Sequence, residues 1–250
     1  IYEALKIGIR ASDRIIIDYD EISGELTEHP EKWFCFSGEN GLDIPVGLEG
    51  ASRTVQIHLG GELQTQHHAL ISGIIGSGKS SLLHTIIISM LLRYGPEDVQ
   101  ICLLDFKRGV EFKIYAESRL QNFRVISLDT EAEFGLAVLR YLEQEQAERA
   151  QEFHDKNCDN IEKYNEIAEK DPDGDICRLP RIVVVIDEFH EMFADPESEI
   201  SKECAMLLEQ VVRQGRALGI HMVLASQTLP ENLTRIYGQM MNRIVLQSTG

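Results

Sequence analysis

The chain has 250 residues and a formal net charge of −17, which makes it strongly acidic. A protein that binds nucleic acid over its whole surface is usually basic, because neutralising phosphates drives the affinity. The charge excludes that class and leaves room only for a local basic patch. No run of about 18 uncharged apolar residues is present, so no membrane span is predicted. Five scattered cysteines, never spaced C-x-x-C, predict free thiols in a reducing compartment without structural zinc.

The first part of the chain, residues 1–66, predicts a small β-rich segment. A strand is expected at Arg14–Asp20. Two further short strands, Asp43–Gly47 and Thr54–Leu59, are joined by a loop that contains Gly50 and predict a hairpin. From residue 67 the pattern changes to alternating strand and helix, so we predict a second domain at 67–250.

Residues 67–250 alternate apolar runs, rich in β-branched residues, with helical patterns. Such runs indicate a parallel sheet that is covered on both faces. The predicted fold class is α/β, with a mostly parallel central sheet flanked by helices. The predicted strands are Ala69–Gly73, Val99–Asp105, Arg124–Leu128, Arg181–Asp187, Ile220–Ser226 and Asn242–Gln247, and the predicted helices are Lys79–Arg93, Thr130–His154, Asp159–Lys170 and Ile200–Leu218.

Two of these helices carry an apolar stripe at helical spacing, which predicts their buried faces. In the predicted helix Thr130–His154 the stripe is Phe134, Val138, Tyr141 and Leu142. In the predicted helix Ile200–Leu218 it is Cys204, Leu207, Leu208, Val211 and Val212.

Residues 73–80, Gly-Ile-Ile-Gly-Ser-Gly-Lys-Ser, match the phosphate-binding pattern G-x-x-x-x-G-K-[ST] between a predicted strand and a predicted helix. Gly76 and Gly78 let backbone N–H groups approach phosphate oxygens, and the helix N-terminus adds further N–H groups. Lys79 is expected to reach the β- and γ-phosphates, and Ser80 to offer a hydroxyl to Mg²⁺. The predicted ATP-binding residues are Gly73, Gly76, Ser77, Gly78, Lys79, Ser80 and Ser81.

The apolar strand that ends at Asp187 supplies the second half of such a site. We expect Asp187 to hold the Mg²⁺ shell together with Ser80, and the next residue, Glu188, to polarise the attacking water. Gln227, after another buried strand, is a candidate γ-phosphate sensor. Arg213 and Arg216 lie in the last turns of the preceding helix, where cations suit the helix dipole. The alternative is an arginine finger that reaches a neighbour's nucleotide.

For two groups of residues, the sequence leaves more than one function possible. His67 and His68, with His190 and Glu191, are conceivable metal ligands, although the sequence places no third ligand with them. Lys107, Arg108 and Lys113 form a small basic cluster after a strand end, which either faces a pore and contacts phosphates or is a solvated loop.

Taken together, the chain resembles the FtsK/SpoIIIE branch of P-loop ATPases from about Leu42 to Gln247. The matching stretches, in order, are HHALISGIIGSGKSSLLHTII, LLDFKRGVEF, NIEKYNE, LPRIVVVIDEF and VVRQGRALGIHMVLASQ. The resemblance implies a RecA-like core in a hexameric ring that moves a polymer through its pore. It also implies that Arg216 acts in trans and that Gln227 is a sensor, which makes Glu188, Lys79, Arg216 and Gln227 the candidate catalytic residues.

The expected function is an ATP-hydrolysing ring motor that translocates double-stranded DNA. The segment Asp105-Phe-Lys107-x-Gly is similar to the one in type VII secretion ATPases, so the alternative substrate is a secreted protein. A nucleotide-binding module without turnover is disfavoured by the intact Lys79, Asp187 and Glu188. We expect a cytoplasmic location, free or as the cytosolic motor of a membrane-anchored protein.

Overall fold

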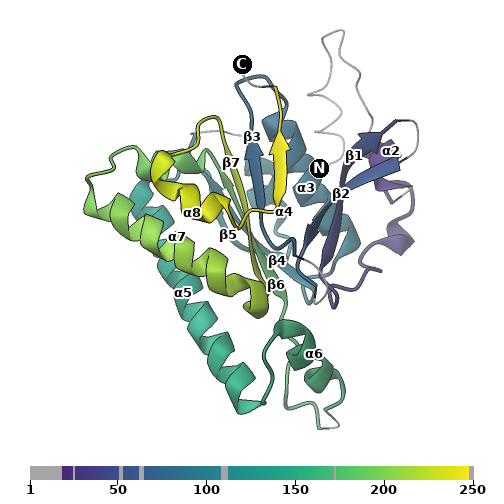
Figure 1. The fold of residues 1–250 in the computed structure, drawn as a ribbon. Coiled ribbons are helices and arrows are strands. Elements are labelled where there is room, and N and C mark those ends of the chain that lie inside the picture. Colours follow the sequence, from purple (N-terminus) through teal and green to yellow (C-terminus); the bar gives the residue numbers. More distant parts are fainter. Residues whose placement is uncertain are drawn as a thin grey trace.

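A computed structural model describes residues 19–24, 26–50, 53–61, 65–107, 112–171 and 173–247. Its centre is a 6-stranded sheet in the order β5-β4-β6-β7-β3-β8, and each of its strand pairings is parallel. Figure 1 shows the sheet between two layers of helices, which confirms the predicted fold class. The strands are β3 (Ala69–Ser72), β4 (Val99–Asp105), β5 (Phe123–Ser127), β6 (Arg181–Asp187), β7 (Ile220–Ser226) and β8 (Asn242–Val245).

The helices follow the expected alternation, with short additions. The four long or medium helices are α3 (Lys79–Arg93), α5 (Ala132–Asp155), α6 (Ile161–Glu169) and α7 (Glu199–Leu218). The short elements are the helices α2 (Tyr19–Ser23), α4 (Lys113–Ser118) and α8 (Thr234–Tyr237), and the 3-10 turns η1 (Pro30–Lys32), η2 (Phe189–Phe193) and η3 (Glu231–Leu233). Within the described part of the chain, no helix combines the length and apolarity that a membrane span requires.

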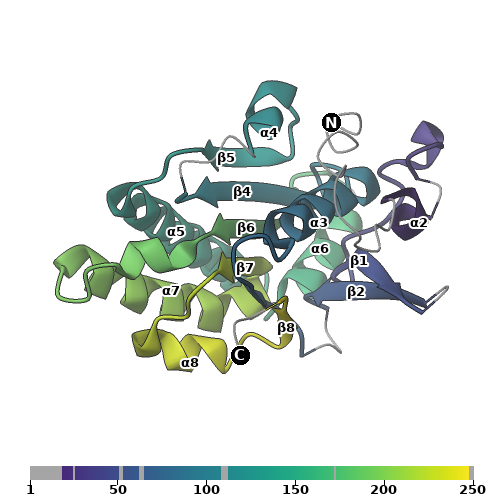
Figure 2. The same cartoon turned by 90° about the horizontal axis from the view of Figure 1, so that it is seen from above.

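Both faces of the sheet are packed, because its central strands are apolar on both sides. Along β6, Val184 and Ile186 belong to the core under α5 and α7, whereas Val183 and Val185 belong to the core under α3. Seen from above, α5 and α7 lie on one side of the sheet and α3 on the other (Figure 2).

The predicted hairpin is confirmed as β1 (Leu42–Glu49) paired antiparallel with β2 (Arg53–Leu59). Its apolar side chains, Ile44 and Ile57 among them, share the core of α3. Figure 2 shows the hairpin outside α3, as a further layer on that face. The division at residue 66 stays a prediction.

Two expectations from the sequence are wrong in detail. In the range Arg14–Asp20, residues 14–18 lie outside the described residues, but Tyr19 and Asp20 are helical in α2 rather than extended. The Tyr19 hydroxyl lies 2.9 Å from Ser89 Oγ on α3, and acidic residues in a first helical turn suit the helix dipole.

The second correction concerns α5. Phe134 and Tyr141 are 44% and 38% exposed, whereas Leu136, Val138, Leu139 and Leu142 are buried. The buried stripe is therefore rotated toward α7 and the sheet, and the Tyr141 hydroxyl accepts a hydrogen bond from Arg124 on β5 instead of entering the core. The predicted stripe of α7 is confirmed, because all five of its residues are buried.

Candidate nucleotide-binding site

The phosphate-binding loop leaves the end of β3 and leads into α3, as predicted. Gly76 and Gly78 have φ angles of 77° and 94°, in the left-handed region where residues other than glycine are strained. A Cβ at either position would meet no atom within 4 Å, so the loop surface there is open. A Cβ at Gly73 would instead overlap Ser77 Oγ and lie 2.9 Å from Leu246 Cβ.

The loop is fastened between two strands. Gly73 N donates to Ser226 O at the end of β7 (3.3 Å), and Ile74 N donates to Gln247 O beyond β8 (3.2 Å). These bonds hold the loop at the carboxyl edge of the sheet, where parallel α/β sheets bind their ligands.

The start of α3 suits an anion. Gly78 caps the helix without a side-chain hydrogen bond, and the first-turn N–H groups of a helix have no acceptor within it. Ser77 Oγ is buried without a hydrogen-bond partner among the described residues. Together with the open glycine surface, this orphaned hydroxyl fits a triphosphate held by the loop. Ser80 is half-buried in the first turn and Ser81 is exposed.

Lys79 joins the loop to the second motif. Its Nζ donates to Asp187 Oδ1 at the end of β6 and to Glu188 Oε1 at 2.8 Å. All three side chains are at least 94% buried, so each charge depends on the others. The hydroxyl of Ser80 and the carboxylate of Asp187 are oxygen ligands of the kind that Mg²⁺ binds. Ser80 directly follows Lys79, the residue that contacts Asp187.

The two carboxyl groups differ in their pKa. Burial raises the pKa of Asp187 above its ordinary value, and the attraction of Lys79 offsets this only in part. Burial also acts to raise the pKa of Glu188, but hydrogen bonds from Lys79 and Gln227 outweigh it, so that pKa is lowered. Glu188 is thus held as a carboxylate, the form that can accept a proton from water.

The backbone of Glu188 is left-handed, with φ 52° and ψ 45°, and it precedes the turn η2. The Glu188 carboxylate lies beside Gln227. The backbone N of Gln227 donates to Glu188 Oε2 (3.1 Å), and its side-chain Nε2 donates to Oε1. The structure therefore brings Lys79, Asp187, Glu188 and Gln227 together, although their roles in catalysis stay predictions.

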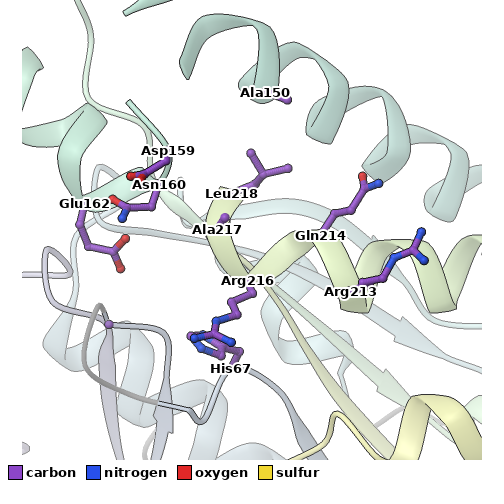
Figure 3. Close-up of a pocket in the computed structure, with 11 residues that line it drawn as sticks. His67, Ala150, Asp159, Asn160, Glu162, Arg213, Gln214, Arg216, Ala217 and Leu218 are labelled. Carbon is purple, nitrogen blue, oxygen red and sulfur yellow. The ribbon is translucent and has the colours of Figure 1, made fainter. Parts of the chain in front are cut away.

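Arg216 lies apart from this group, at the opposite edge of the sheet. It belongs to the last turn of α7, which is followed by Gly219 and the start of β7, and its side chain is exposed. It lines a cavity of about 610 Å³ with Arg213, Asp159 and Glu162. In Figure 3 the Arg216 side chain lies beside His67, whereas that of Arg213 points away from it.

The structure also places the histidines that the sequence left as conceivable metal ligands. His68 Nε2 lies 2.8 Å from Val212 O and its Nδ1 accepts from Met222 N, so this ring supports the fold far from His190. Among the described residues, no group of three or more His, Cys, Asp or Glu side chains could hold a metal ion.

The basic cluster is partly neutralised. Lys107 Nζ lies 3.9 Å from Glu188 Oε1, and Lys113 Nζ lies 3.6 Å from Glu117 Oε1. Arg108 lies outside the described residues.

Sequence reasoning missed Ser226 as a site residue and gave His190 a different role, as a conceivable metal ligand. The His190 Nδ1 atom lies 2.8 Å from Ser226 Oγ and 3.3 Å from Glu188 Oε2. Their signal was a histidine two residues beyond the Asp187-Glu188 pair and a hydroxyl at the end of the sensor strand, but neither is diagnostic without the fold.

Comparison with known proteins gives relatives of two kinds. The chain is 34% identical over 183 residues to the ESX-5 secretion system protein EccC5 of Mycobacterium tuberculosis, an alignment that covers 72% of this chain and 13% of that protein. It is 34% identical over 166 residues to the DNA translocase FtsK of Clostridium tetani, with 66% and 21% covered. The chain thus spans only a small part of these relatives.

Among solved structures, the cytoplasmic domain of the type VII secretion ATPase EccC from Thermomonospora curvata matches with a TM-score of 0.75 and 28% identity. That match covers 88% of this chain and 25% of the other. The family model described as FtsK/SpoIIIE family matches residues 39–230, a range that contains the loop, Asp187, Glu188 and Gln227. The chain is therefore an ATPase domain that belongs to the FtsK/SpoIIIE family.

Proposed function

We propose that this chain is the ATP-hydrolysing motor domain of a ring in which neighbouring copies complete each other's nucleotide sites. The position of Arg216 carries the proposal. Lys79, Glu188 and Gln227 gather where β6 and β7 end, whereas Arg216 is exposed where β7 begins. The 7 residues of β7 span about 20 Å. Arg216 is too distant to serve the nucleotide of its own chain, which supports a role at the nucleotide of a neighbour.

The chemistry within one chain follows from the contacts of Lys79. Bound Mg²⁺ would neutralise phosphate charge, with Ser80 and Asp187 as its protein ligands. Lys79 would donate to phosphate oxygens and so weaken its bond to Glu188. The Glu188 carboxylate would then accept a proton from the attacking water, and Gln227 would orient that water.

The ring is tested by mixing two inactive variants. Lys79→Ala lacks phosphate binding but keeps Arg216, and Arg216→Ala keeps an intact loop. Each alone is expected to be nearly inactive, and their mixture should regain ATP hydrolysis because one chain supplies the arginine to the other's nucleotide. Arg140→Ala, which removes a surface arginine paired with Glu203, is the matched control.

The unmixed wild type gives the second half of this test. Its hydrolysis rate per chain should rise with protein concentration as rings assemble. Full activity of Arg216→Ala alone, or of a chain shown to be monomeric by light scattering, would overturn the proposal.

For the polymer, we propose a protein substrate in preference to double-stranded DNA, and a cytosolic location. A net charge of −17 repels phosphates, and Lys107 and Lys113 are each close to a carboxylate. The likeness to the secretion ATPase of Thermomonospora curvata supports the same choice. DNA stays the second candidate because the Lys107 side chain is 49% exposed. In addition, the DNA translocase FtsK is as identical in sequence to this chain as the secretion protein EccC5 is.

The two substrates are separated by one ATPase experiment and one capture experiment. Duplex DNA added to the assembled ring at low salt is expected to leave the rate unchanged, while the Glu188→Gln variant retains a protein from extracts of the source organism in an ATP-dependent way. Stimulation by DNA that disappears as salt is raised, without such a protein, would establish DNA instead.

A further inference from the structure

His190 lies against the second oxygen of the Glu188 carboxylate, and Ser226 lies against His190. Oε1 of Glu188 accepts from Lys79 and from the Gln227 side chain, whereas Oε2 accepts from Gln227 N and faces His190 Nδ1 at 3.3 Å. His190 is in turn 2.8 Å from Ser226 Oγ, and Ser226 is fully buried. The carboxylate is thus held from both sides.

The hydrogens of this group can be assigned by counting donors. Ser226 has one hydroxyl hydrogen, which it donates to Thr228 O, and its oxygen accepts from Thr228 N at 3.3 Å. The remaining acceptor site of Ser226 faces His190 Nδ1, as does the acceptor-only Glu188 Oε2. A bare Nδ1 would place lone pairs against lone pairs, so Nδ1 carries a hydrogen, which it donates to Ser226 Oγ beside Glu188 Oε2. Nε2 lies 3.3 Å from Glu191 Oε1, so it can carry a hydrogen as well.

We infer that His190 and Ser226 are positioning residues that keep the Glu188 carboxylate aimed when Lys79 turns to the phosphates. The inference rests on the proposed role of Glu188 in activating water. Once Lys79 donates to phosphate, Glu188 loses its nearest charged partner. The hydrogen bonds from Gln227, the His190 contact at 3.3 Å and the Lys107 contact at 3.9 Å are then left to hold it.

The same pair links two segments of the site. His190 belongs to η2, which follows Glu188, and Ser226 ends β7 directly before Gln227. A shift of Gln227 on contact with the γ-phosphate is therefore passed to Glu188 through its own bonds and through Ser226 and His190 together.

The test uses four variants of the full chain at concentrations where rings are assembled. His190→Leu and Ser226→Ala are expected to lower kcat about 10-fold, the size of one hydrogen bond to a charged group. KM for ATP should stay unchanged. His190→Asn, whose amide Nδ2 can donate from the position of Nδ1, should recover most of kcat, whereas His190→Gln, whose donor sits one bond further out, should not.

The exposed His154, at the end of α5, provides the matched control as His154→Leu, which should behave as wild type. A structural role alone would make the kcat losses follow the loss of thermal stability, with no difference between Asn and Gln. That result would overturn the inference.

A second readout needs no nucleotide. ¹⁵N NMR of the His190 ring in the nucleotide-free chain should show the hydrogen on Nδ1, and Ser226→Ala should alter that signal while leaving His154 unchanged. A hydrogen on Nε2 alone would contradict the assignment.

Failure of the two ideas can be told apart. If Glu188→Gln hydrolyses ATP normally, the proposed function of Glu188 is wrong. If Glu188→Gln is inactive but His190→Leu and Ser226→Ala hydrolyse ATP like wild type, only the positioning role is wrong.

Discussion

The two edges of the central sheet hold charge in opposite ways. At the carboxyl edge, Lys79, Asp187 and Glu188 are buried and compensate one another. At the amino edge, Arg213 and Arg216 are exposed, and within the described ranges neither makes an ion pair. Buried charges need partners inside the molecule, whereas exposed ones are free to meet another molecule. This difference supports the proposal that the nucleotide is held within one chain and that an exposed arginine acts on the nucleotide of a neighbour.

Beneath those arginines the amino edge buries neutral imidazoles beside the ion pair of Arg181 and Glu162. Burial lowers the pKa of His68 to about 4, and burial together with the nearby Arg181 lowers the pKa of His221 well below its ordinary value. Each ring is hydrogen-bonded to a backbone carbonyl or faces one, His68 to Val212 and His221 to His67. The amino edge therefore keeps His68 and His221 uncharged beside a charged pair, whereas the carboxyl edge clusters Lys79 with two carboxyl groups.

The largest expected effect is that of Glu188→Gln, a substitution in the site at the carboxyl edge. The amide cannot accept the proton of the attacking water, so the turnover rate is expected to fall roughly 10³-fold while ATP still binds. Single-turnover hydrolysis and equilibrium binding of ATP measure the two quantities separately.

Lys79→Ala is the contrast to that variant, because it should lose tight ATP binding itself. It also leaves Asp187 and Glu188 buried without their cation. Normal turnover by Glu188→Gln would show that another group activates the water.

The amino edge can be strained through Gly215, one residue before Arg216. A Cβ there would overlap the carbonyl oxygen of Ile220, the first residue of β7. Gly215→Ala should therefore cost about 3 kcal/mol in the free energy of unfolding, because a rigid backbone cannot give way to a side chain. Urea unfolding measures this loss.

Gly47→Ala is the matched substitution for that experiment, because a Cβ at Gly47 would meet no atom within 4 Å. If both variants unfold at the same urea concentration, α7 does not pass as close to β7 as the structure has it.

The smallest expected effect is a loss of stability in acid at the amino edge. The folded pKa of His68, about 4, lies below the ordinary value of 6.5, so unfolding takes up a proton. This contribution to stability is full above pH 6.5 and disappears as the pH falls through 4. Between about pH 7 and pH 5 His68 should account for about 2 kcal/mol.

Unfolding free energies of the wild type and His68→Gln, measured across that range, test this effect. The variant should show a shallower dependence on pH, and His154→Gln should match the wild type. Equal slopes for all three chains would mean that the pKa of His68 is the same in the folded and unfolded states.

Much of the fold follows from local pattern. Continuous β-branched runs bounded by Asp or Gly predict β4, β6 and β7 residue by residue, and the helix α3 begins at Lys79 as expected. Parallel strands bring their carboxyl ends to one edge, so the meeting of Lys79, Asp187 and Gln227 is also predictable.

What the sequence does not reveal depends on contacts between distant segments. Arg149, in the charged half of α5, is 2% exposed because its guanidinium donates to Leu218 O and Pro180 O, carbonyls that no local pattern places nearby. The rotation of the α5 stripe and the His190–Ser226 contact have the same origin. Short helices such as α4 and α8 are not predicted, because four to six residues carry too little periodicity.

The left-handed backbone at Glu188 has a consequence for how this position can evolve. Residues other than glycine lose roughly 1 kcal/mol in that conformation, so a position selected for folding alone would drift toward glycine or asparagine. The proposed role of Glu188 in activating water gives a reason for a glutamate to be kept there, with φ 52°. Glycine at this position in a related domain would therefore be a sign that hydrolysis, and with it the need for strain, has been given up.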